Sequence, residues 1–121
     1  MSDLSFVILY VADVAKSQAF YADVLGKPAI EASPGFAMFP AAPGVMLGLW
    51  RADDVKPAAT APGGAELCLT LESESAVDAT AAAWAAKGIE VAQKPTRLDF
   101  GYTFVGLDPD GHRLRVFMPM G

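Results

Sequence analysis

The sequence has little of the residue types on which most catalytic and metal-binding sites depend. Its 121 residues include a single cysteine, Cys68, and a single histidine, His112. One cysteine excludes an intrachain disulfide and a zinc site built from cysteines. His112 has no second histidine or other cysteine to act with, so we interpret it as a residue at the start of a strand and not as a catalytic base.

Positive charge and long apolar runs are also scarce. Nine basic residues stand against 14 acidic ones, the net charge is −5, and no basic stripe runs along the chain. We therefore expect no binding of nucleic acid and no docking on anionic membranes. No apolar run approaches the roughly 20 residues that span a bilayer. The N-terminus lacks the early positive charge of a signal peptide, which makes a cytoplasmic location the expectation.

What the sequence does contain is one pattern of strands and helices that occurs twice. With 53% hydrophobic residues, its 121 residues match a single domain with a real core. Helices are predicted near residues 13–25 and 74–87, each between two strand-like runs, and two further strand-like runs follow in each half. The order β-α-β-β-β, written twice, predicts an α+β fold with eight strands and two main helices.

The halves can be given approximate bounds. We place the first module at about residues 1–52, a linker rich in proline, glycine and alanine at 53–64, and the second module at about 65–121. In the first helix we expect the buried face to carry Phe20, Val24 and Leu25. In the second, Trp84 should anchor the helix on its sheet.

Strand parity predicts which side chains face the helices, because alternate residues of a strand point to opposite faces. In the last strand, Leu114 and Val116 belong to a purely apolar set, whereas Arg115 and Phe117 belong to a mixed set. The apolar sets should pack against the helices. The mixed sets should line the other, concave face of an antiparallel-rich sheet.

Two stretches carry a family resemblance. LYVADVAKSQAFYADVLG and GYTFVGLDPDGHRLRVFMP resemble the start and the end of the vicinal-oxygen-chelate superfamily, which includes glyoxalase I, extradiol dioxygenases and bleomycin-resistance proteins. The runs SPGFAMFP and VMLGLW, with the ending DPDGHRLRV, are most similar to a phenazine-antibiotic resistance protein of that superfamily. The resemblance implies paired βαβββ modules that form a U-shaped cup for a small molecule, within a homodimer.

The superfamily's enzymes hold a divalent metal with His, Glu or Gln side chains that face the cup. The resemblance places these positions at Phe6, near Gly48, at Glu66 and at Arg115. Of these four, only Glu66 could bind a metal, and Arg115 would repel one. Hard divalent ions need several oxygen or nitrogen donors in one place. We therefore expect no metal, no other cofactor and no catalytic residue.

The candidate ligand-binding residues share the open face of the strands. Trp50 could stack on a planar heterocycle, and Gly48 would leave room beside it for a flat ligand. Alternatively, the Trp50 side chain packs in the core or in a dimer contact. The further candidates for an apolar pocket, for which ordinary core packing is an equal alternative, are Phe6, Ile8, Phe36, Met38 and Phe117.

The polar residues on the same faces allow two interpretations. Arg115 and Glu66 should approach each other across the cup, either as an ion pair or with Arg115 gripping a ligand carboxylate in fork geometry. Tyr10 and Tyr102 could offer hydroxyl groups to a ligand or satisfy backbone groups at strand ends. Cys68 faces the cup without a basic partner that would make it a thiolate, so we interpret it as a small apolar side chain that fills space.

Three functions remain open on this reasoning. The first is a binding protein that sequesters a planar aromatic antibiotic or related natural product. The second is a metal-dependent lyase, isomerase or dioxygenase whose ligands lie elsewhere in the chain. The third is a module used for contact between proteins. The loss of donors at Phe6, Gly48 and Arg115 favours the first.

Overall fold

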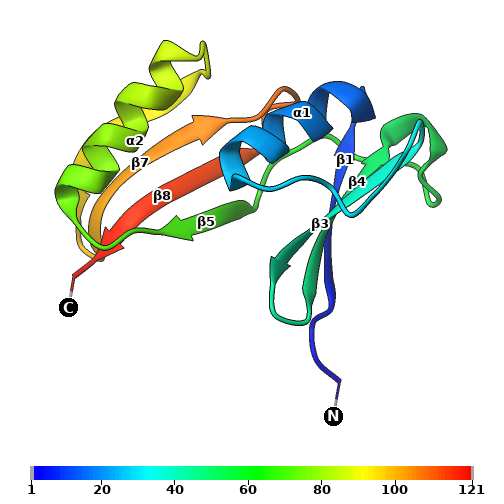
Figure 1. Cartoon of the computed structure of the whole chain (residues 1–121), viewed down its shortest axis with the longest axis horizontal. Coiled ribbons are helices and arrows are strands. Elements are labelled where there is room, and N and C mark those ends of the chain that lie inside the picture. Colours follow the sequence, from blue (N-terminus) through cyan, green and yellow to red (C-terminus); the bar gives the residue numbers. More distant parts are fainter. Residues whose placement is uncertain (1, 121) are drawn as a thin grey trace. The chain divides into compact units, whose positions relative to one another are not determined.

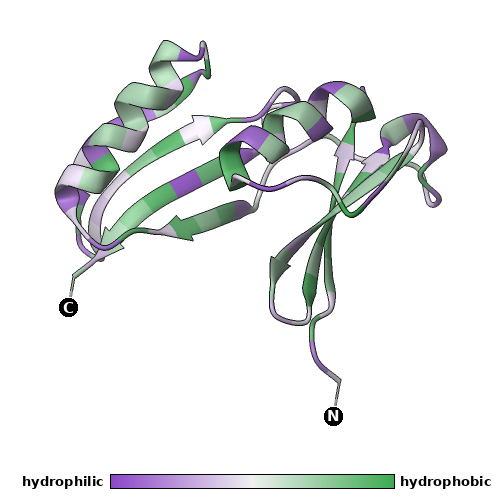
Figure 2. Cartoon of the chain, viewed as in Figure 1, coloured by the Kyte–Doolittle hydropathy of each residue, from purple (hydrophilic) through white to green (hydrophobic). Residues whose placement is uncertain are grey.

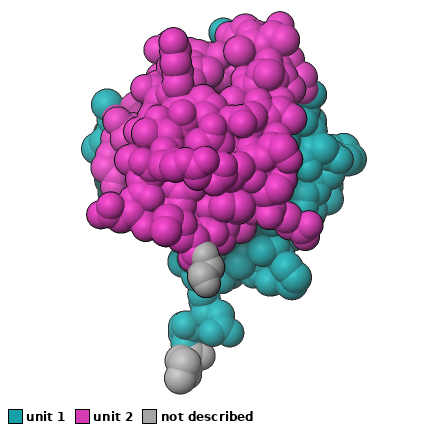
Figure 3. All heavy atoms as spheres, turned by 90° about the vertical axis from the view of Figure 1, so that its left-hand side faces the viewer, with its two compact units in different colours: residues 1–61 teal, residues 62–121 magenta. Residues whose placement is uncertain are grey.

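The computed structural model describes residues 2–120. The chain divides into two compact units, residues 1–61 and residues 62–121, which Figure 3 colours separately. We call them unit 1 and unit 2. Within the described residues, each unit holds one α-helix and one four-stranded sheet.

Unit 1 has a mixed sheet in the order β1-β4-β3-β2. Its first strand runs parallel to its fourth, and the other neighbours are antiparallel. Its elements are β1 (Phe6–Val11), α1 (Val14–Leu25), β2 (Glu31–Ser33), β3 (Phe36–Ala42), β4 (Val45–Arg51) and the short 3-10 helix η1 (Ala52–Asp54).

Unit 2 repeats this topology in the order β5-β8-β7-β6, with β5 parallel to β8. Its elements are β5 (Glu66–Thr70), α2 (Glu74–Ala86), β6 (Val91–Leu98), β7 (Gly101–Leu107) and β8 (Arg113–Pro119). The predicted α+β fold of two βαβββ modules is confirmed. Figure 1 shows the elements in chain order, with α2 lying along β7 and β8.

The helix ends follow from capping residues that the sequence displays. The side chain of Asp13 accepts a hydrogen bond from the backbone N–H of Lys16 at 3.1 Å, which satisfies one of the free donors of the first turn of α1. Gly26 ends α1 in the left-handed conformation, with φ of 70°. Ser73 caps α2 in the same way as Asp13 caps α1, accepting from the N–H of Ala76 at 3.0 Å.

The buried face of α1 differs from the prediction. The structure buries Val14, Ser17 and Tyr21, whereas Phe20, Val24 and Leu25 stay half-buried. The spacing of the buried residues, three and then four positions, is that of one helix face. Small Ser17 stands at the centre of this face, where it lets the helix approach β3 and β4 closely.

The helix of unit 2 is anchored by an aromatic pair, as predicted for Trp84. Its indole is 4% exposed and meets the ring of Phe104 edge to face, with centroids 5.2 Å apart. Gly106 of β7 makes this fit possible, because a Cβ atom there would lie 2.7 Å from Cε3 of Trp84. The helix therefore covers one face of the sheet and leaves the other face open.

Hydropathy also differs between the helix-covered face and the open face of the sheet in unit 2. Figure 2 shows a hydrophilic band in the middle of β8, whose other residues are mostly hydrophobic. Residues 2–120 contain no helix with the length and apolar character needed to cross a lipid bilayer.

Candidate functional site

The open face of the sheet in unit 1 is apolar. The register pairs Ile8 with Gly48 and Tyr10 with Trp50, and it pairs Gly48 in turn with Met38. Since paired residues lie on one face of a sheet, these side chains share the side opposite the buried Leu47 and Leu49. We call this surface the apolar platform; its residues are Phe6, Ile8, Tyr10, Phe36, Met38, Gly48 and Trp50.

Much of the platform is accessible to solvent. Phe6 and Ile8 are each 41% exposed, and Phe36, Met38 and Trp50 are half-buried. The ring of Trp50 has a structural neighbour in Tyr10, with centroids 6.5 Å apart and planes at 72°. Large apolar side chains that gather on one open face are typical of a surface that binds another molecule.

Gly48 does not leave free space beside Trp50, contrary to the sequence-based expectation. A Cβ atom on Gly48 would lie 2.9 Å from Cζ of Phe36 and 3.4 Å from Cγ1 of Ile8. The ring of Phe36 thus already lies over the glycine. The role of Gly48 is to let an aromatic ring of the chain itself approach the backbone of β4, which makes the platform continuous.

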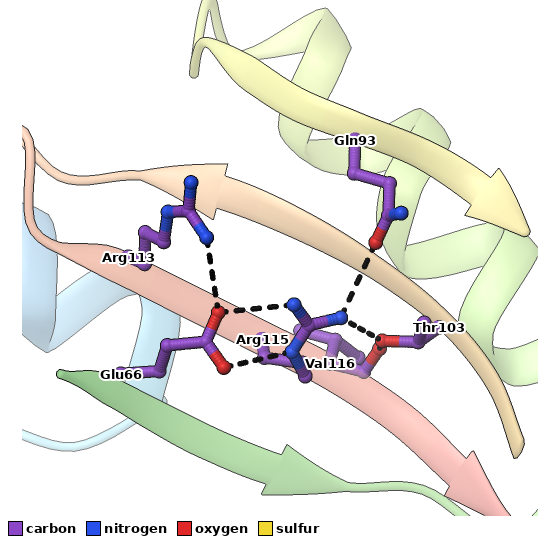
Figure 4. Close-up of polar contacts among 6 residues, drawn as sticks. All are labelled: Glu66, Gln93, Thr103, Arg113, Arg115 and Val116. Carbon is purple, nitrogen blue, oxygen red and sulfur yellow. Dashed lines mark hydrogen bonds and ion pairs between the residues drawn. The ribbon is translucent and has the colours of Figure 1, made fainter. Parts of the chain in front are cut away.

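The open face of the sheet in unit 2 is polar, and its centre is Arg115. Figure 4 shows the guanidinium held between side chains from three other strands. Its Nε and Nη2 donate to the two carboxylate oxygens of Glu66 at 2.9 and 3.0 Å, and its Nη1 donates to Gln93 and Thr103, each at 3.2 Å. We call these residues, with Arg113, the arginine cluster.

The ion pair of Glu66 and Arg115 lies within one sheet, between neighbouring strands, and is only partly shielded from solvent. The side chain of Arg115 is 16% exposed and that of Glu66 is 27% exposed. The hydrogen bonds from Arg115 lower the pKa of Glu66, and burial opposes them. The same hydrogen bonds raise the pKa of Arg115, so both groups stay charged. The two residues do meet, as predicted, but as neighbours on adjacent strands of one sheet and not across a cup.

Arg113 is held differently. Its guanidinium is 3.6 Å from Oε2 of Glu66, an oxygen that already accepts a bond from Arg115, and its side chain is 59% exposed. It lies two residues before Arg115 on β8 and therefore points to the same face. The cluster thus contains two cations and one anion.

Sequence reasoning missed Gln93 and Thr103 as partners of Arg115. Thr103 lies on the open face because it pairs with Phe117, and its hydroxyl also donates to the carbonyl of Val116 at 3.0 Å. Gln93 reaches the same face only because register shifts on both sides of it interrupt the pairing of β6 with β7. Strand parity could have indicated Thr103, whereas an irregular register has no clear sequence signal.

An aromatic pair continues the open face of unit 2 beyond Arg115. The rings of Phe100 and Phe117 meet edge to face with centroids 5.8 Å apart, and Cζ of Arg115 is 5.6 Å from the centroid of Phe100. Phe100 is 44% exposed. Cys68, which pairs with Arg115, is exposed and not packed as a filler.

Tyr102, a candidate for contact with a ligand, has a structural partner instead, and His112 lies at the start of a strand, as expected. The hydroxyl of Tyr102 donates to Asp78 of α2 at 2.7 Å, on the helix-covered side of the sheet, and this bond raises the pKa of Tyr102. The backbone N–H of His112 donates to the side chain of Asp108 at 2.8 Å, which places His112 in the hairpin before β8. Neither residue belongs to the open faces.

The residues at the implied metal positions do not fit a divalent ion. Phe6 and Gly48 carry no donor atom, and Arg115 carries a positive charge. Both oxygens of Glu66 already accept hydrogen bonds from Arg115. Among residues 2–120, no three His, Cys, Asp or Glu side chains come together in a group that could hold a metal.

Two proteins resemble the chain over most of its length. The phenazine antibiotic resistance protein EhpR from Enterobacter agglomerans is 30% identical over 112 residues, which cover 90% of this chain and 86% of that protein. The solution structure of protein ATC0852 from Agrobacterium tumefaciens is 43% identical, covers 100% of both chains and has a TM-score of 0.91.

The family assignment follows from the sequence match and agrees with the fold. A glyoxalase-related enzyme from Fulvimarina pelagi has the same fold at 20% identity, with a TM-score of 0.87 over 100% of this chain and 94% of that one. Residues 4–116 match the Glyoxalase/Bleomycin resistance protein/Dioxygenase superfamily. The chain belongs to this superfamily, as its sequence resemblance predicted.

Proposed function

We propose that the protein binds and sequesters a planar aromatic antibiotic or a related natural product, without a metal ion. The observation that carries the proposal is the apolar platform, on which Phe36 and Trp50 lie beside the exposed Phe6 and Ile8. Flat aromatic ligands gain free energy both from burial of apolar area and from ring contacts. Met38 adds an adaptable side chain to the same surface.

The relatives support a resistance function of this kind. EhpR is named for resistance to phenazine antibiotics, and phenazines are planar aromatic compounds. Sequestration requires affinity and no turnover, so the loss of metal donors at Phe6, Gly48 and Arg115 does not impair it. A homodimer and a cytoplasmic location, both expected from the sequence, belong to the same proposal.

The experiment that tests the proposal is a calorimetric titration of the purified protein with phenazine. The parent should bind, and Trp50→Ala should weaken binding by about 1–3 kcal/mol, which is the range for the loss of a stacked aromatic side chain. His112→Ala is the matched control, because His112 lies outside the apolar platform and should leave the affinity unchanged. Equal affinity of Trp50→Ala and the parent would contradict the role of the platform.

The alternative function is a metal-dependent enzyme of the same superfamily. Elemental analysis of the protein, purified without chelators, separates the two functions. Binding of phenazine without stoichiometric divalent metal is the expected result. A bound metal at one ion per chain would mean that the donor set lies outside the positions considered above, and it would refute the metal-free proposal.

A further inference from the structure

The open face of the sheet in unit 1 carries one charged side chain, and this side chain is acidic. Glu31 of β2 pairs with Met38 of β3, so it lies on the same face as the apolar platform. The only other charged residue in strands β1 to β4 is Arg51, which has the parity of the buried Leu49 and therefore points to the helix-covered face. The platform thus has a negative charge at its edge and no positive charge.

The carboxylate of Glu31 is available to a ligand. Its side chain is exposed, and it takes part in no ion pair among residues 2–120. Arg51 instead pairs with Asp54, to which its Nε and Nη2 donate at 3.0 and 3.1 Å. A cation that approaches Glu31 from solvent therefore breaks no ion pair of the protein.

Three aromatic residues of the platform form a row across the sheet. The register pairs Tyr10 with Trp50 and Trp50 with Phe36, and all three are half-buried. We call them the aromatic row. The face of an aromatic ring is its negative part and attracts a cation, most strongly in tryptophan. The aromatic row and Glu31 thus favour a ligand charge of the same sign.

Glu31 lies within reach of a ligand on the aromatic row. Its partner Met38 is two residues from Phe36 on β3, and β2 is separated from β4 only by β3. Neighbouring strands lie about 4.8 Å apart, so β2 lies about 10 Å across the sheet from β4. This separation is comparable to the long axis of a three-ring heterocycle. A ligand over Trp50 and Phe36 can therefore bring a charged ring nitrogen close to Glu31.

We infer that unit 1 selects a planar aromatic cation, which lies over the aromatic row with Glu31 as its counter-charge. The inference rests on the proposed function, since it assigns the charge of the ligand proposed above. The ligand class is then a cationic nitrogen heterocycle. The fork that the sequence suggested for a ligand carboxylate, at Arg115, is already taken by a carboxylate of the protein, because its Nε and Nη2 donate to Glu66.

Three compounds with one ring system and different charges test the inference: N-methylphenazinium, phenazine and phenazine-1-carboxylate. In calorimetric titrations of the full chain, the parent should bind the cation about fivefold more tightly than phenazine, which corresponds to about 1 kcal/mol. It should bind the carboxylate more weakly than phenazine. Added salt should reduce these differences. Glu31→Gln should reduce the preference for the cation to about twofold, since the aromatic row remains, and Glu31→Lys should abolish it.

Asp23→Asn is the matched control, because Asp23 is exposed on α1 and away from the open face. It removes the same charge from the same unit and should keep the fivefold preference. If the parent binds phenazine as tightly as the cation, or if Glu31→Gln keeps the full preference, the selection of a cation is wrong while the proposed function stands. Equal losses in Glu31→Gln and Asp23→Asn would also refute the role of Glu31. If none of the three compounds binds the parent, both proposals fail.

Discussion

A methyl group added to Gly106 would test how tightly α2 packs on the sheet of unit 2. The new Cβ atom would lie 2.7 and 2.8 Å from two carbons of the Trp84 indole and 3.4 Å from Cγ2 of Ile89. An ordinary contact between carbon atoms is about 3.5 Å or more, so the indole would have to move by about 0.8 Å. Trp84 is 4% exposed and its ring also contacts Phe104, so the core leaves the indole little room to move.

The expected loss of stability in Gly106→Ala is a packing cost reduced by a gain in conformational entropy. Overfilling a well-packed core costs about 1–3 kcal/mol, and a rigid, buried indole favours the upper end of that range. Alanine regains about 0.5–1 kcal/mol, because glycine in a strand loses more conformational freedom on folding. Gly106→Ala should therefore lower the free energy of unfolding by about 2 kcal/mol, and the midpoint of thermal unfolding should fall by roughly 8 °C.

Gly48→Ala is the matched comparison, since it adds the same methyl group under another aromatic ring. Its Cβ atom would lie 2.9 Å from Cζ of Phe36, but that ring is half-buried on an open face and can turn outward. The cost of the contact and the gain in conformational entropy should nearly cancel, and stability should stay within about 0.5 kcal/mol of the parent.

Urea unfolding followed by circular dichroism measures both changes. The expected result is a lower midpoint for Gly106→Ala at an unchanged slope, with little change for Gly48→Ala. Equal stability of the two variants would show that the Trp84 ring is not confined between α2 and β7. The account of how α2 is anchored would then be refuted.

Two further predictions concern Glu66 and the oligomeric state. Glu66→Gln should lower the free energy of unfolding by about 1 kcal/mol at neutral pH, because it weakens charge-assisted hydrogen bonds to Arg115. The pKa of Glu66 is lower in the folded protein, so the parent should lose this stability as pH falls from the ordinary glutamate range through the folded pKa. Glu66→Gln should lack that part of the pH dependence. Identical acid unfolding of the two proteins would contradict this prediction. Light scattering should give the mass of two chains, and a monomer mass at micromolar concentration would rule out the proposed homodimer.

The order of the elements could be predicted because its signals are local. Asp13 and Ser73 mark helix starts through side-chain hydrogen bonds, and Gly26 marks a helix end through its left-handed backbone. Alternation along β8 separates Leu114 from Arg115. Such signals depend on neighbours within a few residues. The two α-helices and eight strands of residues 2–120 therefore followed from the sequence alone.

Other features could not be predicted because they depend on contacts between strands. The place of Gln93 beside Arg115 results from irregular pairing in β6, and the ring of Phe36 over Gly48 results from the register of β3 with β4. The face of α1 was misjudged because Phe20 and Leu25 are more apolar than Ser17. Fit against the sheet, and not apolar character, decided which residues are buried.

The registers of the two sheets show how one topology gives two different open faces. Gly48 pairs with Ile8 of β1 as Arg115 pairs with Cys68 of β5, so the two occupy equivalent positions in their units.

The equivalent neighbours on the adjacent strand are Met38 and Val105. The next residues of that strand on the same face are Phe36 and Thr103. In unit 1 a glycine on the central strand is covered by a large ring from its neighbour. In unit 2 a large guanidinium on the central strand reaches over a small threonine. The same position of the central strand thus carries opposite choices of residue in the two units, a glycine beneath an apolar ring and a charged arginine. Neither open face taken by itself suits a divalent metal ion, which needs several donors in one place, because Gly48 carries no donor atom and Arg115 carries a positive charge.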